Sequence, residues 1–125
     1  MADVTNVLVC DDDAEMRALL RLALDTDPLL SVVGEAADGG AAMRLAGTLQ
    51  PDVVLVDIEM PGPPFGAVVT GVRRAAPAAA IVVLSAHGPE CIDAEAADVV
   101  AAHLLKTTDL GAVRRTLREA GAAAR

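Results

Sequence analysis

Two apolar runs of the 125-residue chain are followed by acidic side chains. The triplet Asp11-Asp12-Asp13 comes shortly after Val7-Leu8-Val9, and Asp57 ends a second run at residues 53–56. Carboxylates that converge repel one another unless a cation joins them or a proton is taken up. Oxygen ligands with positions left for water favour Mg²⁺, and a carboxylate can also be a nucleophile that carries a phosphoryl group. The aspartates are therefore candidates for a metal-dependent phosphoryl-transfer site.

Two other polar residues follow apolar runs in the second half of the chain. Ser85 comes after residues 81–84, and Lys106 comes after residues 103–105. Lys106 is the only lysine among the ten basic residues. Its ammonium group is a compact point charge, which the larger and planar guanidinium group of an arginine would not reproduce. Phosphoryl transfer needs its negative charge neutralised, which a metal ion and an ammonium group supply. The pattern favours Asp57 as phosphoryl acceptor, Asp11 and Asp12 as metal-holding residues, and Lys106 and Ser85 as clamps.

Each of these residues also has a purely structural interpretation. The triplet would interact favourably with the dipole at the start of a following helix, by ~0.3–1 kcal/mol per charge. One acidic residue would be enough for that role, so three need a further explanation. An aspartate after a strand is commonly a turn residue, and a serine there says little. His87 and His103 lack partners at metal spacing, so we expect a surface-loop residue and a partly buried strand residue. The combination of the acids with Lys106 favours the chemical interpretation.

Five short apolar runs recur along the chain and predict strands. They are residues 7–9, 32–33, 53–56, 81–84 and 103–105. Continuous runs of this kind suit strands buried on both faces of a parallel sheet. Helical spacing between them predicts a first helix whose buried stripe is Met16, Leu19, Leu20, Ala23 and Leu24, a second capped by Asp38, a third over 67–75 and a last one from about residue 110. Segment 90–97 is acidic and lacks an apolar stripe, which leaves a regular fourth helix open.

This alternation predicts an α/β fold of the flavodoxin-like (βα)5 type. It is an open parallel sheet with strand order 2-1-3-4-5 and helices on both faces. Because neighbouring strands lie about 4.8 Å apart, the residues that follow strands one, three, four and five should meet at one edge. We expect one domain over residues 1–120, with the start of a linker or C-terminal tail at 121–125.

Composition excludes several classes of protein. Hydrophobic residues make up 54% and charged residues 22%, as in globular domains. A formal net charge of −8 disfavours direct contact with nucleic acid or an anionic membrane. Cys10 and Cys91 cannot form a disulfide framework, no apolar stretch approaches the ~20 residues of a membrane span, and no basic segment leads into an apolar signal core. We expect a soluble, cytoplasmic protein.

Four segments taken together resemble the receiver domain of bacterial two-component response regulators. They are VLVCDDDAEMR, VVLVDIEMPG, IVVLSA and LLK, in that order. The resemblance covers residues 5–120, and the segments GEAADGGAA and LLK are most similar to regulators of the NarL/FixJ type. It departs from the family at Pro63-Pro64, at Thr107 and in segment 86–102, which is about a residue short.

The resemblance implies a role for each site residue. Asp57 resembles the phosphoacceptor and Lys106 the lysine that pairs with the phosphoryl group. The implied cofactor is Mg²⁺, held directly by Asp12, Asp57 and the backbone carbonyl of Glu59, and through water by Asp11. Ser85 resembles the switch hydroxyl, and His103 occupies the position of an aromatic rotamer switch. Glu59 and His87 stand where the family sets the lifetime of the acyl phosphate.

The same resemblance implies partners. A sensor histidine kinase would donate the phosphoryl group, and phosphorylation would favour a homodimer through the fourth helix, fifth strand and fifth helix. The domain would control a transcriptional output domain that is absent from this chain. It would not itself bind nucleic acid or membrane, and it would not be an enzyme that turns over an external substrate.

Two other functions remain open from the sequence. One is a receiver that acts as a protein-interaction module without phosphorylation. The other is a small phosphatase with Asp11 as nucleophile and Asp13 as acid. The residues after the triplet lack the Thr or Val expected of such phosphatases, and the chain has no room for a cap domain.

Overall fold

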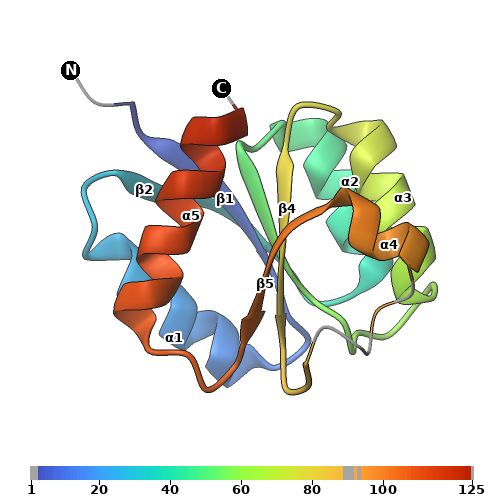
Figure 1. Cartoon of the computed structure of the whole chain (residues 1–125), viewed down its shortest axis with the longest axis horizontal. Helices are drawn as coiled ribbons and strands as arrows, with labels where there is room; N and C mark the ends of the chain where they lie inside the picture. The colour runs from blue at the N-terminus through green and yellow to red at the C-terminus, as the bar shows by residue number, and fades with distance from the viewer. Residues whose placement is uncertain (1–2, 89–91, 93, 125) are drawn as a thin grey trace.

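Strands and helices alternate along the chain (Figure 1). The computed structural model describes residues 3–88, 92 and 94–124. In chain order the elements are β1 (Thr5–Cys10), α1 (Ala14–Asp25), β2 (Leu30–Ala36), α2 (Gly39–Leu49), β3 (Val53–Asp57), α3 (Phe65–Ala75), β4 (Ala80–Ser85), α4 (Ala94–Val99), β5 (Val100–Leu105) and α5 (Leu110–Ala124). Across the described residues, none of these helices has the length and apolar character needed to cross a bilayer.

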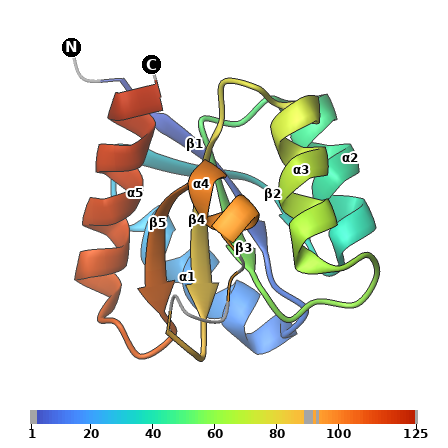
Figure 2. The ribbon, with the colours of Figure 1, turned by 45° about the vertical axis from the view of Figure 1, so that its right-hand side comes forward.

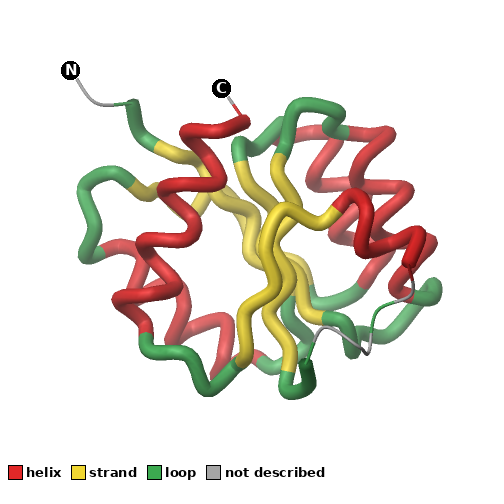
Figure 3. Tube along the Cα trace, viewed as in Figure 1, coloured by secondary structure: helices red, strands yellow, loops and turns green. Residues whose placement is uncertain are grey.

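The five strands form one parallel sheet with the order β2-β1-β3-β4-β5. The predicted α/β fold and its strand order are therefore confirmed. Helices α1 and α5 cover one face of the sheet, and α2, α3 and the short α4 lie on the other (Figure 3). Because all strands run in the same direction, their carboxyl ends share one edge, as the arrowheads of β4 and β5 show in Figure 2.

Each face of the sheet has its own hydrophobic core. Successive residues of a strand point to opposite faces, so Leu8 and Val54 pack towards α2 and α3, whereas Val9 and Leu55 pack towards α1 and α5. All four side chains are essentially inaccessible to solvent. This burial on both faces explains why the central strands are continuous apolar runs.

Among the described residues, three helices begin at aspartates that cap them, and Asp109 does so for α5 by accepting a hydrogen bond from the N–H of Ala112 over 3.0 Å. The Asp13 carboxylate accepts hydrogen bonds from the backbone N–H groups of Glu15 and Met16, and Asp38 accepts one from Ala41. The prediction of Asp38 as N-cap is confirmed. Asp13 thus stabilises the first turn of α1, which separates its role from that of the two aspartates before it.

Three apolar residues predicted to be buried are exposed. Leu19 is 46% exposed while Leu20, Ala23 and Leu24 are buried, because the face of α1 that meets the sheet is centred on these three residues and Leu19 lies beside it. Val33 is 36% exposed and Leu105 is 41% exposed because β2 and β5 are the edge strands of the sheet. The expectation that every run is buried on both faces is wrong for β2 and β5.

The fourth helix is short, and the last helix is longer than predicted. Helix α4 has six residues and leads directly into β5, which begins at Val100; residues 90, 91 and 93 of the uncertain segment lie outside the described residues. Residues 121–124, expected to begin a linker or tail, are helical and form the last turn of α5, while the domain bounds stay a prediction. Gly121 is buried there so closely that a Cβ would lie 2.4 Å from Cγ2 of Thr5, so packing on β1 continues the helix.

Candidate functional site

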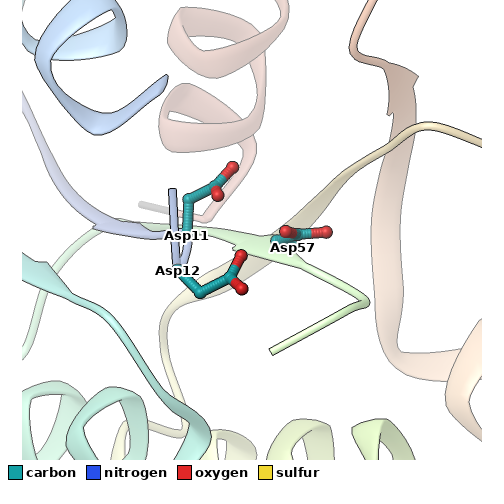
Figure 4. A group of neighbouring side chains, drawn as sticks. All are labelled: Asp11, Asp12 and Asp57. Atoms are coloured by element: carbon teal, nitrogen blue, oxygen red, sulfur yellow. The ribbon is translucent and has the colours of Figure 1, made fainter. Parts of the chain in front are cut away.

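The predicted site residues come from the carboxyl edge of the sheet. Asp57 is the last residue of β3, and the neighbouring strand β1 ends at Cys10, immediately before Asp11. Cys10 pairs with Val56 in the register of the two strands, which brings the next residue of each strand to the same level. Figure 4 shows the side chains of Asp11, Asp12 and Asp57 gathered there.

The three aspartates form one cluster. A carboxylate oxygen from each lies within 4.8 Å of those of the other two. Asp11 and Asp57 are buried, with 1% and 3% of their surface exposed, while Asp12 is exposed. The cluster is therefore open to solvent on the side of Asp12 and enclosed by protein on the other side.

Backbone hydrogen bonds fix the two buried carboxylates. The N–H of Asp13 donates to Oδ1 of Asp11 over 2.9 Å, and the N–H of Glu59 donates to Oδ1 of Asp57 over 3.1 Å. The guanidinium of Arg17 also donates to the backbone carbonyl of Asp11 over 2.7 Å. These bonds leave Oδ2 of both carboxylates directed elsewhere.

Lys106 lies between those two oxygens. Its Nζ is 3.1 Å from Oδ2 of Asp57 and 3.2 Å from Oδ2 of Asp11. Lys106 reaches them from the end of β5, two strands away from β3, because it follows the strand directly. One ammonium group thus faces three carboxylates, which leaves the cluster with an excess of negative charge.

Burial and neighbouring charges together shift the pKa values of Asp57 and Lys106. Burial raises the pKa of Asp57 above its ordinary value and the charge of Asp11 adds to the rise, against the opposing effects of the Glu59 N–H and of Lys106. Burial would lower the pKa of Lys106, but its hydrogen bond to Asp57 and its ion pair with Asp11 outweigh burial and raise it. Lys106 therefore stays charged at neutral pH, and the charge of Asp57 is only partly compensated.

The cluster fits a divalent cation. Oδ2 of Asp11 is buried and makes no well-aligned hydrogen bond to any described residue, although Lys106 is close. Three carboxylate oxygens with an opening to water are the hard ligands that Mg²⁺ accepts. The residues that could hold such an ion are Asp11, Asp12 and Asp57. Glu59 donates its backbone N–H to Asp57, and the role of its carbonyl as a ligand, implied by the resemblance, stays a prediction.

Ser85 ends β4 and takes part in a second polar group. Its buried hydroxyl lies 2.5 Å from the carbonyl oxygen of His87 and 2.8 Å from Nε2 of His103. The same Nε2 lies 3.2 Å from the His87 carbonyl. These contacts direct the hydroxyl towards β5 and the segment after β4, and none of the hydrogen bonds described for it reaches Asp57.

An exposed pair lies beside the cluster. Oε1 of Glu59 is 3.6 Å from Nε2 of His87, and both side chains are largely in solvent. The structure thus places together the two residues for which the resemblance implies control of the phosphoryl lifetime. That role remains a prediction.

Sequence reasoning missed two of these contacts. The bond between His103 and Ser85 could have been suspected from strand register, because β4 pairs with β5 and His103 precedes the end of its strand by two residues. Nothing in the sequence indicated the hydrogen bond from Arg17 to the backbone carbonyl of Asp11, apart from the position of Arg17 in the first turn of α1. Cys10, which directly precedes Asp11, is buried, and burial raises the pKa of its thiol.

Comparisons with known proteins agree with this arrangement. The signal receiver domain of NarL from Mycobacterium tuberculosis is 31% identical, with a TM-score of 0.87 over 96% of this chain and 98% of that one. The response regulator domain of Thermotoga maritima CheB is 29% identical, with a TM-score of 0.86 over 95% of this chain and 97% of that one.

A curated relative matches over a shorter segment. A protein-glutamate methylesterase/protein-glutamine glutaminase of Symbiobacterium thermophilum is 54% identical over 55 residues, which is 44% of this chain and 15% of that protein. The chain therefore matches only a small part of this relative. The family described as the response regulator receiver domain matches residues 7–118. With nearly the whole fold covered by that match, the chain belongs to the response regulator receiver domain family.

Proposed function

We propose that this receiver domain is a phosphoryl-accepting switch, with Asp57 as the acceptor and a sensor histidine kinase as the donor. The observation that supports this most directly is the surroundings of Asp57. It is buried at the carboxyl end of the central strand, 3.1 Å from Lys106 and beside two further carboxylates. A structural turn residue would need neither the ammonium group nor the other acids.

In the proposed transfer, a carboxylate oxygen of Asp57 attacks the phosphorus atom of a phosphorylated histidine. A P–O bond forms while the P–N bond breaks, and the leaving imidazole nitrogen takes up a proton. The N–H of Glu59 holds one oxygen of Asp57, and Lys106 faces the other. Lys106 is thus placed to contact the oxygens of the incoming phosphoryl group.

We infer that Mg²⁺ is the cofactor, held directly by Asp12, Asp57 and the backbone carbonyl of Glu59, and through water by Asp11. When bound, the ion supplies positive charge that neutralises the phosphoryl oxygens. The residues themselves orient the acceptor and exclude water from its buried side. The excess of carboxylates over ammonium groups, and the buried oxygen of Asp11 without a well-aligned bond, support this inference.

Phosphorylation would be read out through Ser85. Its hydroxyl would be drawn towards the phosphoryl group, and the face formed by α4, β5 and α5 would change shape. That face would also carry a homodimer of the phosphorylated protein. Because the short α4 ends at the residue before β5 begins, we expect the two elements to move together in such a change.

Two outputs are supported by different relatives. The likeness to NarL over almost the whole chain favours control of a transcriptional output domain. The local identity to methylesterases favours an output of that enzymatic kind. A basic DNA-binding region encoded with this domain would favour the first output, and an esterase domain encoded with it would favour the second.

The acceptor role can be tested by intact-mass spectrometry after incubation with acetyl phosphate and Mg²⁺. We expect the mass of one phosphoryl group to be added, in a linkage that survives acid and is lost in base. Asp57→Asn should gain none, chelation of Mg²⁺ should abolish the gain, and Asp38→Asn should behave as the wild type because it changes an exposed helix cap. An adduct that persists in Asp57→Asn, or its absence from the wild type, would contradict the proposal.

A further inference from the structure

The hydroxyl of Ser85 is held in place by a histidine side chain. Its oxygen lies 2.8 Å from Nε2 of His103, on the neighbouring strand β5, and 2.5 Å from the carbonyl oxygen of His87. Ser85 is buried, and His103 is half-buried. The three groups form a compact polar cluster between the end of β4, β5 and the segment that follows β4.

Only one arrangement of protons satisfies this cluster. A carbonyl oxygen can only accept, so the single proton of the Ser85 hydroxyl is donated to His87. The serine oxygen then accepts, and His103 must donate to it from Nε2. The second contact of Nε2, 3.2 Å from the same carbonyl, is also that of a donor.

The other ring nitrogen leads to the same conclusion. Nδ1 of His103 is buried and has no hydrogen-bond partner among the described residues. A proton placed on Nδ1 would be a buried donor without an acceptor, which is more unfavourable than a bare lone pair there. The neutral ring with its proton on Nε2 therefore suits both sides of the imidazole.

We propose that His103 is a positioning residue that holds the Ser85 hydroxyl in its resting place by donating a hydrogen bond from Nε2. Resting on the proposed phosphorylation of Asp57, it follows that this bond must be released before Ser85 can turn towards a phosphoryl group. His103 thus acts through a polar bond to the switch hydroxyl, and the strength of that bond sets how readily the domain switches. Because the His87 carbonyl belongs to the same cluster, release also frees the start of the segment after β4.

The consequence can be measured with beryllofluoride and Mg²⁺, using ¹⁹F NMR of the bound ligand. His103→Phe keeps an aromatic ring but removes the donor, so we expect about two- to tenfold tighter beryllofluoride binding, which is the effect of one hydrogen bond. His103→Gln places an amide N–H near the position of Nε2 and should restore affinity to within about twofold of the wild type. In Ser85→Ala, the further change His103→Phe should have no effect, because the bonded oxygen is gone. His103→Leu serves in place of His103→Phe if that variant does not fold.

Each outcome decides one question. Unchanged or weaker binding by folded His103→Phe, or an effect that persists in Ser85→Ala, overturns the inference. Absence of bound beryllofluoride from the wild type overturns the proposed function instead. Independently of any ligand, long-range ¹H–¹⁵N spectra of the resting protein should show His103 protonated on Nε2, with His103→Gln assigning the signal. A ring protonated on Nδ1 would overturn the positioning role even if Asp57 accepts phosphate.

Discussion

Neutralising Asp57 should stabilise the domain in the absence of divalent cations. The cluster places its carboxylates within 4.8 Å of one another, so each repulsion is about 3.5 kcal/mol at an effective dielectric constant of ~20. The attraction between Asp57 and Lys106 at 3.1 Å is about 5 kcal/mol on the same basis. Two repulsions exceed one attraction by about 2 kcal/mol. Because Asp12 is exposed and its share is screened, Asp57→Asn should raise the free energy of unfolding by about 1–2 kcal/mol.

The pH dependence follows from the pKa of Asp57. Its value in the folded protein is raised above that in the unfolded chain, so the folded state binds the proton more tightly. Protonation of Asp57 therefore stabilises the folded wild type at low pH. This stabilisation is lost as the pH rises through the pKa of Asp57 in the folded protein. The advantage of Asp57→Asn should be small near pH ~4 and grow towards neutral pH.

Urea and thermal denaturation in the presence of a chelator provide the assay. For a domain of this size the gain corresponds to a rise in melting temperature of about 3–8 °C. Asp38→Asn is the matched control, because asparagine caps a helix as well as aspartate and its stability should change by less than about 0.5 kcal/mol. Destabilisation by Asp57→Asn, or a gain that does not depend on pH, would refute the reasoning about charge.

Three other changes test the packing and the charge balance. Lys106→Met should lower the free energy of unfolding by about 1–3 kcal/mol in urea titrations without divalent cation, because it leaves two buried carboxylates unpaired. Gly121→Ala should lower it by about 1–3 kcal/mol in thermal melts, because Thr5 is buried and β-branched and cannot move away; no loss would mean that α5 does not pack there. Leu24→Ala should cost about 2–5 kcal/mol by the same methods, and a loss below 1 kcal/mol would contradict the described core.

The fold was predictable because its signals are local and repeated. Continuous apolar runs mark strands that are covered on both faces, and the alternation with helices leaves few topologies. The same reasoning failed at β2 and β5, since a run of apolar residues does not say whether its strand lies at the edge. It also misplaced Leu19, whose neighbours on α1 define a narrower buried face than the periodicity suggested.

The gathering of the site residues followed from topology, whereas the fine contacts did not. Once strand order is known, the residues after β1, β3 and β5 must meet, and the structure brings Asp11, Asp57 and Lys106 into contact. The hydrogen bond between His103 and Ser85 depends on the register of β4 and β5 and on side-chain rotamers, which periodicity does not carry. The end of α5 packs closely on Thr5 at Gly121, and the composition of this Ala- and Gly-rich segment does not indicate that contact.

The central claim is that Asp57 carries the phosphoryl group. Reduction with borohydride after treatment with acetyl phosphate and Mg²⁺ converts an aspartyl phosphate to homoserine, and peptide mass mapping then locates it. We predict homoserine in place of Asp57, with every other aspartate unmodified. Modification of Asp11 or Asp12 instead, or an unmodified peptide containing residue 57, would contradict it.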